Sequence, residues 1–410
     1  MFGTDARYQA VRLIAAASAA SVTFFGLTAP ASAAPAAAPL GVITGAGVEG
    51  AVPGSYIVVL KPGSAAAGRV SSASQELARE YGGTVGANYL STVRGFQLHA
   101  TAFQAARLAA DESVQYVEQD ATFSSTAVPS ASAEQVTWGL DRIDQRTAKL
   151  SKSYRYTSAT GVTAYVIDTG VRVSHQEFGG RASNGWDFVD NDKVANDCNG
   201  HGTHVAGTIG GATYGVAKDV DLVALKVLGC DGSGKFSDFI AAVDWVTANA
   251  KLPAVANMSL GGPVSKALDA AVNRSIAKGV TYAIAGGNEN KNACKSSPGG
   301  TPDAITVGAV DKFDKRASFS NYGTCLDLFA PGVDIKSAGK ASNTAVKTMS
   351  GTSMAAPHVA GAAALALGEH PDWTPRQVRD DLVTNAGSGL VRSPGSGSPN
   401  KLLYTGHLAS

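Results

Sequence analysis

The stretch that decides the fold is Gly351-Thr352-Ser353-Met354-Ala355-Ala356-Pro357-His358-Val359-Ala360, in a chain of 410 residues. A glycine-containing turn precedes a run of small residues, which predicts that Ser353 lies at the N-terminus of a helix. Unpaired backbone N–H groups and the positive end of the helix dipole can there stabilise negative charge on an attacked carbonyl oxygen. Ser353 is therefore a candidate nucleophile, and capping of the helix is the alternative role for its hydroxyl.

Two upstream segments supply candidate partners for this serine. They are 165–170 (YVIDTG), which contains Asp168, and 199–208 (NGHGTHVAGT), which contains His201. Because a serine hydroxyl is a weak nucleophile at neutral pH, His201 is expected to take its proton during attack and return it to the leaving amine. Asp168 is expected to hold the imidazole in one tautomer and to stabilise the imidazolium. The order Asp, His, Ser is that of subtilisin rather than of chymotrypsin or the α/β-hydrolases.

The same residues have simpler alternative roles. Asp168 ends an apolar run and can start a turn, and His201 and His204 can be ordinary buried side chains. Cys198, His201 and His204 follow one another at intervals of three residues, which suggests zinc at first sight. A second pair of ligands is missing, so the sequence favours catalysis over a zinc site.

Two further motifs define a family resemblance. They are 138–145 (WGLDRIDQ) and 317–323 (ASFSNYG). Together with the three segments above, they make the region from about Trp138 to about Asn385 resemble the subtilisin-like serine proteases, in the proteinase K branch and closest to aqualysin-type secreted bacterial enzymes. The resemblance implies a serine endopeptidase that hydrolyses polypeptide substrates through an acyl-enzyme on Ser353.

The resemblance also implies an oxyanion site and a substrate cleft. Segment 285–288 (AGGN) places Asn288 at the position of the family's oxyanion asparagine, where it acts with the backbone N–H of Ser353. The expected substrate-binding residues are Gly232, Ser233, Gly234, Ser259, Leu260, Gly261, Ala285, Gly286 and Gly287. Main-chain hydrogen bonds in such a cleft give broad specificity. The glycines leave room for a large apolar or aromatic side chain before the cut bond (P1), and these segments contain no acidic residue to favour a basic one. Ordinary strand ends and turns are the alternative.

Apolar segments of strand length alternate with helical stretches after Gly161. Strands are expected at 162–167, 222–228, 255–260, 280–285 and 305–310, and helices at 203–210, 238–250, 266–278, 353–367 and 375–385. Near-continuous apolar strands separated by helices are typical of a parallel sheet covered on both faces. The predicted fold class is α/β, with a doubly wound, mostly parallel sheet of subtilisin type preceded by a small α+β inhibitory prodomain.

The N-terminal residues have the pattern of a secretory signal peptide. Arg7 and Arg12 precede an apolar stretch over 13–27 and small residues at 31–34 (ASAA), which predicts a signal peptide over 1–34 and a secreted, extracellular protein. A membrane anchor is the alternative, but the stretch is short and rich in Ala and Ser. Residues 35–50 are rich in Ala, Pro and Gly and are expected to form a disordered linker.

A small α+β unit is predicted over 51–122. Its strands are expected at 55–60, 93–98 and 114–120, and its helices at 74–81 and 102–110. Segments 56–60 (YIVVL) and 117–120 (VEQD) resemble the inhibitory propeptide of subtilases, which implies an intramolecular inhibitor; a permanent accessory domain is the alternative. Residues 123–130 are expected to be a cleavable linker and 131–410 the catalytic domain. The bond Ser130–Ala131 is the expected cut, with cleavage a few residues to either side left open.

Four cysteines lie in the predicted catalytic domain, which suits an oxidising destination. Three pairings are possible from the residues alone. The resemblance implies the pairs Cys198–Cys230 and Cys294–Cys325. Free thiols are the alternative.

A calcium site is also implied by the resemblance. Its ligands are the backbone carbonyls of Pro302 and Ala304 and the carboxylate of Asp327. Calcium takes six to eight oxygens, so waters would complete the shell. An ordinary surface carboxylate is the alternative role for Asp327.

Composition limits the remaining classes of function. The formal net charge is +1, which gives no basis for nucleic-acid binding, and 44% of residues are hydrophobic, enough for a substantial core. The resemblance implies a self-processing zymogen, and we expect a monomer that does not associate with membranes after signal removal. A catalytically silent binding protein with the same fold and an esterase with the same nucleophile are the other hypotheses.

Overall fold

The structure is a computed structural model that describes residues 40–64, 67–125, 128–130 and 136–409. The predicted signal peptide, residues 1–34, lies outside the described residues. Within them, no helix is long and apolar enough to cross a membrane.

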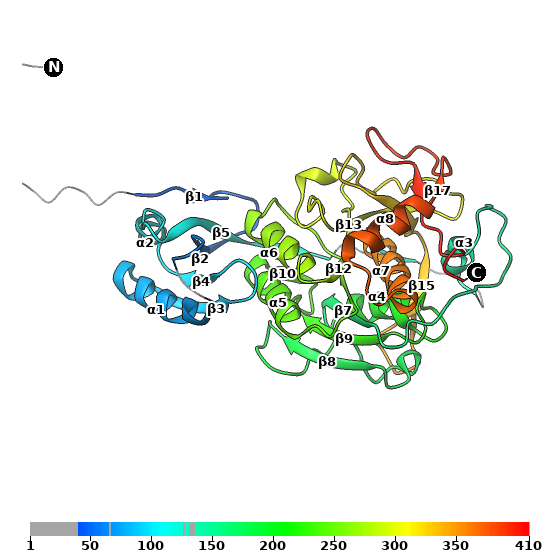
Figure 1. Cartoon of the computed structure of the whole chain (residues 1–410), viewed down its shortest axis with the longest axis horizontal. Helices are drawn as coiled ribbons and strands as arrows, with labels where there is room; N and C mark the ends of the chain where they lie inside the picture. Colours follow the sequence, from blue (N-terminus) through cyan, green and yellow to red (C-terminus); the bar gives the residue numbers. More distant parts are fainter. Residues whose placement is uncertain (1–39, 65–66, 126–127, 131–135, 410) are drawn as a thin grey trace, which may run out of the picture. The chain divides into compact units, whose positions relative to one another are not determined.

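A nine-stranded sheet forms the centre of the larger domain, in the order β17-β18-β14-β13-β12-β11-β7-β9-β8 (Figure 1). Its strands are β7 Thr163–Asp168, β8 Ala182–Asp187, β9 Asp221–Lys226, β11 Ala254–Met258, β12 Val280–Ala285, β13 Ile305–Val310, β14 Leu328–Pro331, β17 Gly387–Ser388 and β18 Lys401–Leu402. All neighbours pair in parallel except β17 and β18. The predicted mostly parallel sheet is therefore confirmed.

Helices cover both faces of this sheet. The helices are α3 Trp138–Ile143, α4 His201–Gly210, α5 Phe236–Asn249, α6 Lys266–Ile276, α7 Thr352–Glu369 and α8 Pro375–Asn385. Along β7, Ala164 and Val166 join one core with α4, α7 and α8, whereas Tyr165 and Ile167 join another with α5 and α6. Alternate residues of a strand point to opposite faces, so a strand buried on both sides has the continuous apolar pattern seen in the sequence.

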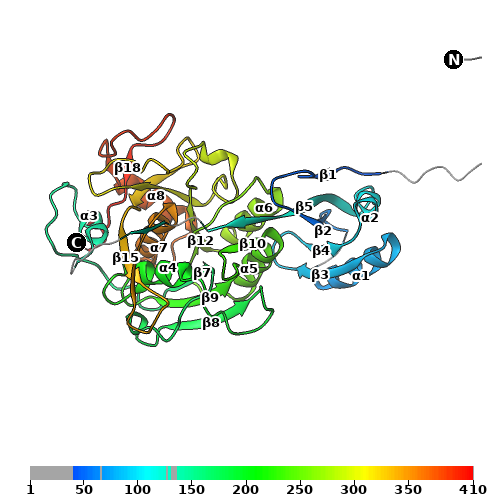
Figure 2. The ribbon, with the colours of Figure 1, turned by 180° about the vertical axis from the view of Figure 1, so that it is seen from behind.

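Helix α7 is the innermost helix. All its residues from Thr352 to Leu367 are buried, and small side chains allow α4 to pack closely against it. Figures 1 and 2 both show α4 and α7 side by side. Because the first turn of α7 carries Ser353, burial of this helix fixes the position of the candidate nucleophile.

The prodomain has its own sheet, in the order β1-β5-β2-β4-β3. Its elements are β1 Ile43–Thr44, β2 Ala51–Leu60, α1 Val70–Tyr81, β3 Thr84–Tyr89, β4 Gly95–His99, α2 Ala102–Leu108 and β5 Val114–Ser124. The sequence did not predict β3, and β1 lies in the segment expected to be disordered. β1 is ordered because it pairs with β5, a partner more than 70 residues away along the chain.

Strands β5 and β6 both extend into residues 123–130, the segment expected to be a cleavable linker before the predicted Ser130–Ala131 cut. β5 continues to Ser124 because its end pairs antiparallel with β10 (Ser233–Lys235) of the catalytic domain. β6 (Val128–Ser130) pairs antiparallel with β16 (Val346–Ser350), which in turn pairs with β15 (Ile335–Ala338). Both partners come from distant parts of the chain, so local composition could not reveal them.

Buried carboxylates join the prodomain to the catalytic domain. Asp244 of α5 accepts hydrogen bonds from the backbone N–H groups of Leu90, Ser91 and Thr92, at 2.6–3.1 Å. Glu118 of β5 accepts bonds from Ser265 Oγ at 2.5 Å and from the Ala267 N–H at 3.1 Å, where α6 begins. A carboxylate at a helix N-terminus is stabilised by the helix dipole, so these contacts hold the two domains in one arrangement.

Candidate active site

Asp168 and His201 come together where β7 ends and α4 begins. Asp168 is the last residue of β7, and His201 is the first residue of α4. His201 Nδ1 and Asp168 Oδ1 are 2.7 Å apart, and both residues are at most 1% exposed. Polar groups beyond the carboxyl ends of parallel strands are typical of sites in α/β proteins.

The loop around this pair is held by further hydrogen bonds. The carboxylate of Asp197 accepts bonds from Thr169 Oγ1 at 2.9 Å and from the Gly200 N–H at 2.6 Å, so it ties the two segments together. A Cβ at Gly202 would lie 2.1 Å from the carbonyl oxygen of Gly170. Only glycine at this position allows α4 to approach β7 closely enough for the pair to form.

The pKa of His201 is raised from its ordinary value. Burial alone favours the neutral imidazole and lowers the pKa, but the charge of Asp168 and its hydrogen bond favour the imidazolium more strongly. His204 has no such partner: burial lowers its pKa to about 3, and its Nε2 bonds the carbonyl of Ile335 at 2.9 Å. His201 is therefore suited to proton transfer, whereas His204 serves packing.

Ser353 lies in the first turn of α7, beside the cleft. Its Oγ donates to the backbone carbonyl of Ser259 at 3.1 Å, and Ser259 Oγ donates to the backbone carbonyl of Ser353 at 2.8 Å. Nε2 of His201 is buried and has no hydrogen-bond partner within the described part of the chain. The Ser353 hydroxyl can rotate away from Ser259 to bond this nitrogen. Catalytic hydrogen bonds of this kind often form only when substrate is bound.

Asn288 follows β12 and faces the same cleft. Its Oδ1 accepts bonds from the Thr352 N–H at 2.8 Å and from Thr352 Oγ1 at 3.0 Å. Because Thr352 holds this oxygen, the side-chain amide of Asn288 is fixed relative to Thr352, the residue that precedes Ser353. This arrangement suits a side chain that donates to a developing oxyanion.

The cleft beside Ser353 has a volume of about 610 Å³. Of the predicted substrate-binding residues, Ser233, Leu260, Gly261, Ala285 and Gly287 line it. Gly232 and Gly234 lie in or beside β10, Ser259 bonds Ser353, and Gly286 follows β12. Glu289 was not predicted: it is an exposed cleft residue whose carboxylate accepts a bond from Asn321 Nδ2 at 2.8 Å. Its place directly after Asn288 was the available signal.

Two disulfides brace the loops near the site. Cys198 pairs with Cys230 and Cys294 with Cys325, as the resemblance implied. Asn199, two residues before His201, donates to the carbonyl of Cys230 at 3.0 Å. Since the sulfur of Cys198 is bonded to Cys230, it does not form the zinc site that its spacing from His201 suggested.

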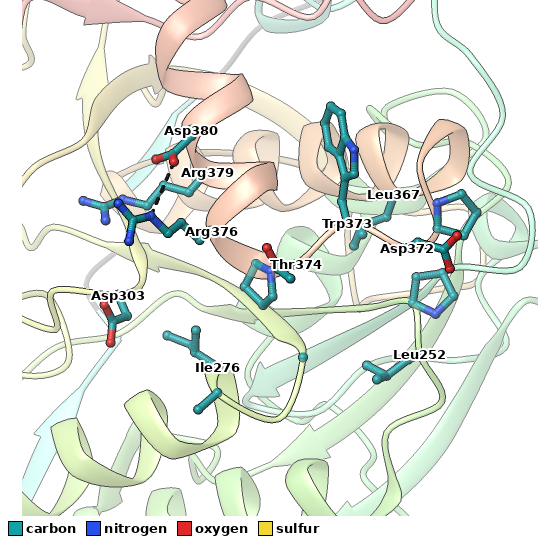
Figure 3. Close-up of a pocket in the computed structure, with 15 residues that line it drawn as sticks. Leu252, Ile276, Asp303, Leu367, Asp372, Trp373, Thr374, Arg376, Arg379 and Asp380 are labelled. Atoms are coloured by element: carbon teal, nitrogen blue, oxygen red, sulfur yellow. Dashed lines mark ion pairs between the residues drawn. The ribbon is translucent and has the colours of Figure 1, made fainter.

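A second, larger pocket of about 990 Å³ lies elsewhere, between Leu252, Ile276 and Trp373 (Figure 3). Asp303 and the ion pair Arg376–Asp380 lie toward one end of it. None of the candidate catalytic residues lines this pocket. Ser353 and Asn288 line the smaller cleft instead.

Comparisons with known proteins agree with this geometry. Residues 159–403 match the Subtilase family, and residues 55–126 match Peptidase inhibitor I9. The chain is 50% identical over 374 residues to an extracellular serine proteinase of Thermus sp. (strain Rt41A), covering 87% of this chain and 90% of that protein. It is 53% identical over 317 residues to alkaline serine exoprotease A of Vibrio alginolyticus, covering 77% of this chain and 59% of that protein. The crystal structure of a cold adapted subtilisin-like serine proteinase superposes with a TM-score of 0.65 at 55% identity, covering 66% of this chain and 99% of that one.

The chain belongs to the subtilase family. It is a secreted subtilisin-like serine protease with an N-terminal inhibitor-type propeptide.

Subtilases generally bind structural calcium, and the resemblance placed a calcium site at Pro302, Ala304 and Asp327. Asp327 Oδ1 accepts bonds from Arg379 at 2.5 and 2.9 Å, and Oδ2 accepts one from the Thr306 N–H at 2.8 Å. A calcium ion bound to this carboxylate would have to displace the guanidinium. No group of three or more His, Cys, Asp or Glu side chains within the described ranges could hold a metal. The observed contacts of Asp327 therefore favour an ion pair with Arg379, and calcium at Pro302, Ala304 and Asp327 stays a prediction.

Asp327→Asn tests this disagreement. We expect the variant, made in a Ser353→Ala background, to lower the melting temperature by several degrees, since breaking the ion pair costs on the order of 1–3 kcal/mol. The loss should be the same in calcium and in chelator. Asp303→Asn, at an exposed neighbouring position, is the control and should change little. A loss that occurs only in calcium would show that Asp327 binds the ion.

Proposed function

We propose that this protein is an endopeptidase of broad specificity that prefers a large apolar or aromatic P1 residue and processes its own precursor. The observation that carries the proposal is the position of β5. Its end lies along β10 as an extended antiparallel strand, and Ser124 bridges to Gly261 on the other side. The cleft therefore binds a peptide as an added strand between two backbone segments.

This mode of binding explains the expected breadth of specificity. Main-chain hydrogen bonds do not depend on the identity of the side chains, so many sequences can be bound. Selectivity then comes from pockets, and the walls of the P1 pocket are the buried Leu260 and Ala285. The charged side chains that the catalytic domain places on the cleft, Glu289, Lys291 and Lys295, are exposed, which favours apolar residues in the interior of the pocket.

The proposed catalytic sequence uses Ser353 as nucleophile and the buried His201–Asp168 pair as its base. His201 removes the proton of Ser353 Oγ as the oxygen attacks the carbonyl carbon of the scissile bond. The side-chain amide of Asn288 and the backbone N–H of Ser353 stabilise the resulting oxyanion. The imidazolium, stabilised by Asp168, protonates the leaving amine, and water then hydrolyses the ester on Ser353 by the same steps in reverse order.

The proposal is tested with tetrapeptide amides and the corresponding esters that differ only at P1. We expect kcat/KM for Phe or Leu at P1 to exceed that for Glu or Lys by about tenfold or more, since burying such a side chain is worth about 1.5–3 kcal/mol. We expect the peptide amides, and not only the esters, to be hydrolysed. Hydrolysis of esters alone would favour the esterase hypothesis, and no hydrolysis of either would favour a binding protein.

A further inference from the structure

We propose that Asn321 is a positioning residue for the oxyanion site: it holds the loop that carries Asn288, and it raises kcat by fixing that loop. The inference rests on the proposed oxyanion role of Asn288 and adds the residue that keeps it in place. Asn321 belongs to the motif at 317–323 (ASFSNYG), to which neither the triad nor the bound strand assigns a task. It is 1% exposed and lines the cleft beside Ser353.

The side chain of Asn321 bonds the loop on both sides of Asn288. Its Nδ2 donates to the carbonyl oxygen of Gly286 at 2.8 Å, two residues before Asn288. Its Oδ1 accepts bonds from the N–H groups of Glu289 at 3.2 Å and Lys291 at 2.8 Å, which follow Asn288. A buried amide whose donors and acceptor are all used keeps one orientation, so this side chain fixes the course of the loop.

The backbones of the two segments are also joined. The Asn321 N–H donates to the carbonyl oxygen of Gly287 at 2.9 Å, and the Asn290 N–H donates to the carbonyl oxygen of Phe319 at 2.8 Å. Gly287 has a φ of +100°, and a Cβ there would lie 2.2 Å from Asn321 Nδ2. A glycine is therefore required at position 287 for the asparagine to approach the loop this closely.

Asn288 is thereby held from two directions. Its side-chain oxygen accepts the two bonds from Thr352 described above, so the side chain is tied to the start of α7. Its backbone neighbours, Gly287 and Glu289, are both tied to Asn321. An oxyanion donor contributes to catalysis only when it is preorganised, and a misplacement of about 1 Å in an active site can cost about 10²-fold in rate.

A role in stability alone is the alternative for Asn321. Asn321→Ala leaves one carbonyl and two N–H groups of the loop without these partners, so it should lower the melting temperature in either case. Ser320→Ala is the matched control, because Ser320 is the preceding residue and is equally buried. Its Oγ accepts a bond from the Ala309 N–H of β13 at 3.0 Å and donates to the carbonyl oxygen of Asn321 at 2.9 Å. Both of these bonds lie outside the loop 286–291.

The test is a double-mutant cycle of Asn321→Ala and Asn288→Ala, with hydrolysis of the best tetrapeptide amide as the measurement. The prodomain of each variant is first removed by added wild-type enzyme that is then separated from it. Loss of the oxyanion asparagine costs about 10²–10³-fold in kcat in subtilisin. We expect Asn321→Ala alone to lower kcat by about tenfold. In the Asn288→Ala background it should lower kcat by no more than about twofold further, because the group that it positions is gone.

The division between kcat and KM gives a second readout. KM should change by less than about threefold in Asn321→Ala, because the strand partners of a bound peptide lie on β10 and at Gly261. Ser320→Ala should keep kcat within about threefold, also where its melting temperature falls as far as that of Asn321→Ala. An equal loss of kcat in the control would assign the effect to stability and overturn the proposal.

The cycle separates failure of this inference from failure of the proposed function. An unchanged kcat in Asn321→Ala, or the same loss with and without Asn288, would overturn the positioning role and leave the oxyanion role standing. An unchanged kcat in Asn288→Ala would overturn both.

Asn321→Asp keeps the proposal testable where the alanine variant does not fold. A carboxylate can accept from the Glu289 and Lys291 N–H groups, but it cannot donate to the carbonyl oxygen of Gly286. It also lies against the carboxylate of Glu289, whose Oε2 is 2.8 Å from Asn321 Nδ2 in the wild type. We expect kcat to fall by about tenfold here as well, and again by no more than about twofold in the Asn288→Ala background. A wild-type kcat in Asn321→Asp would overturn the proposal.

Discussion

Ser353→Ala is expected to lower kcat for peptide hydrolysis by about 10⁶-fold, the scale known for the nucleophile of subtilisin. Without the hydroxyl, no acyl-enzyme forms. The remaining rate comes from Asn288 and from binding in the cleft, which still stabilise attack by water. Steady-state hydrolysis of the best tetrapeptide amide measures the loss, with the variant's prodomain first removed by added wild-type enzyme that is then separated from it.

The structure offers a matched control for this variant. Ser350 lies three residues earlier, and its Oγ accepts a bond from the Asp334 N–H at 2.8 Å. Ser350→Ala removes a hydroxyl from the strand that leads into α7 and should keep kcat within about threefold. The Ser353→Ala protein should keep its melting temperature within a few degrees. Residual activity above about one per cent of wild type would mean that another group is the nucleophile.

Asp168→Asn is expected to lower kcat by about 10⁴-fold at neutral pH, the scale known for the corresponding change in chymotrypsin-type proteases. The 2.7 Å contact with His201 Nδ1 holds the imidazole in the tautomer that leaves Nε2 ready to accept the serine proton. An amide in place of the carboxylate can reverse that tautomer, and it no longer stabilises the imidazolium. The loss should appear in kcat rather than in KM.

The pH dependence of kcat/KM gives an independent test of the same variant, because the direction of its shift is predicted. Asp168 raises the pKa of His201, and the imidazole must be neutral to act as the base. Activity is therefore lost as pH falls through that pKa, and removing the charge should move the acidic limb of kcat/KM to lower pH. Asp221→Asn, at an exposed position at the start of β9, should leave the limb unmoved. A shift of the limb to higher pH in Asp168→Asn would contradict the pairing.

The strands and site segments that depend on neighbouring residues in the sequence were mostly predicted. The parallel strands β7, β11, β12 and β13 are continuous apolar runs because both faces are buried, so their pattern was visible. The serine and histidine segments were equally visible because glycines and small residues surround each of them. β8 was missed because it is an edge strand whose sequence, ASNGWD, is polar and partly exposed.

Features made by distant contacts could not be predicted. The end of β5 is ordered by β10, more than 100 residues later, and β6 by β16, more than 200 residues later. Calcium at Asp327 was expected from the family resemblance, but Arg379, 52 residues away, pairs with this carboxylate. Pairings of this kind depend on the folded sheet, which periodicity and composition do not describe.

The measurement that tests the central claim most directly is labelling with a fluorophosphonate that reacts with activated serines, followed by mass spectrometry of the peptides. We expect one label per processed molecule, located on Ser353, and loss of peptide hydrolysis in proportion to labelling. His201→Ala, with its prodomain removed by added wild-type enzyme that is then separated from it, should not be labelled, because the base that activates the hydroxyl is gone. A label on another residue, or full peptide hydrolysis after complete labelling of Ser353, would contradict the account.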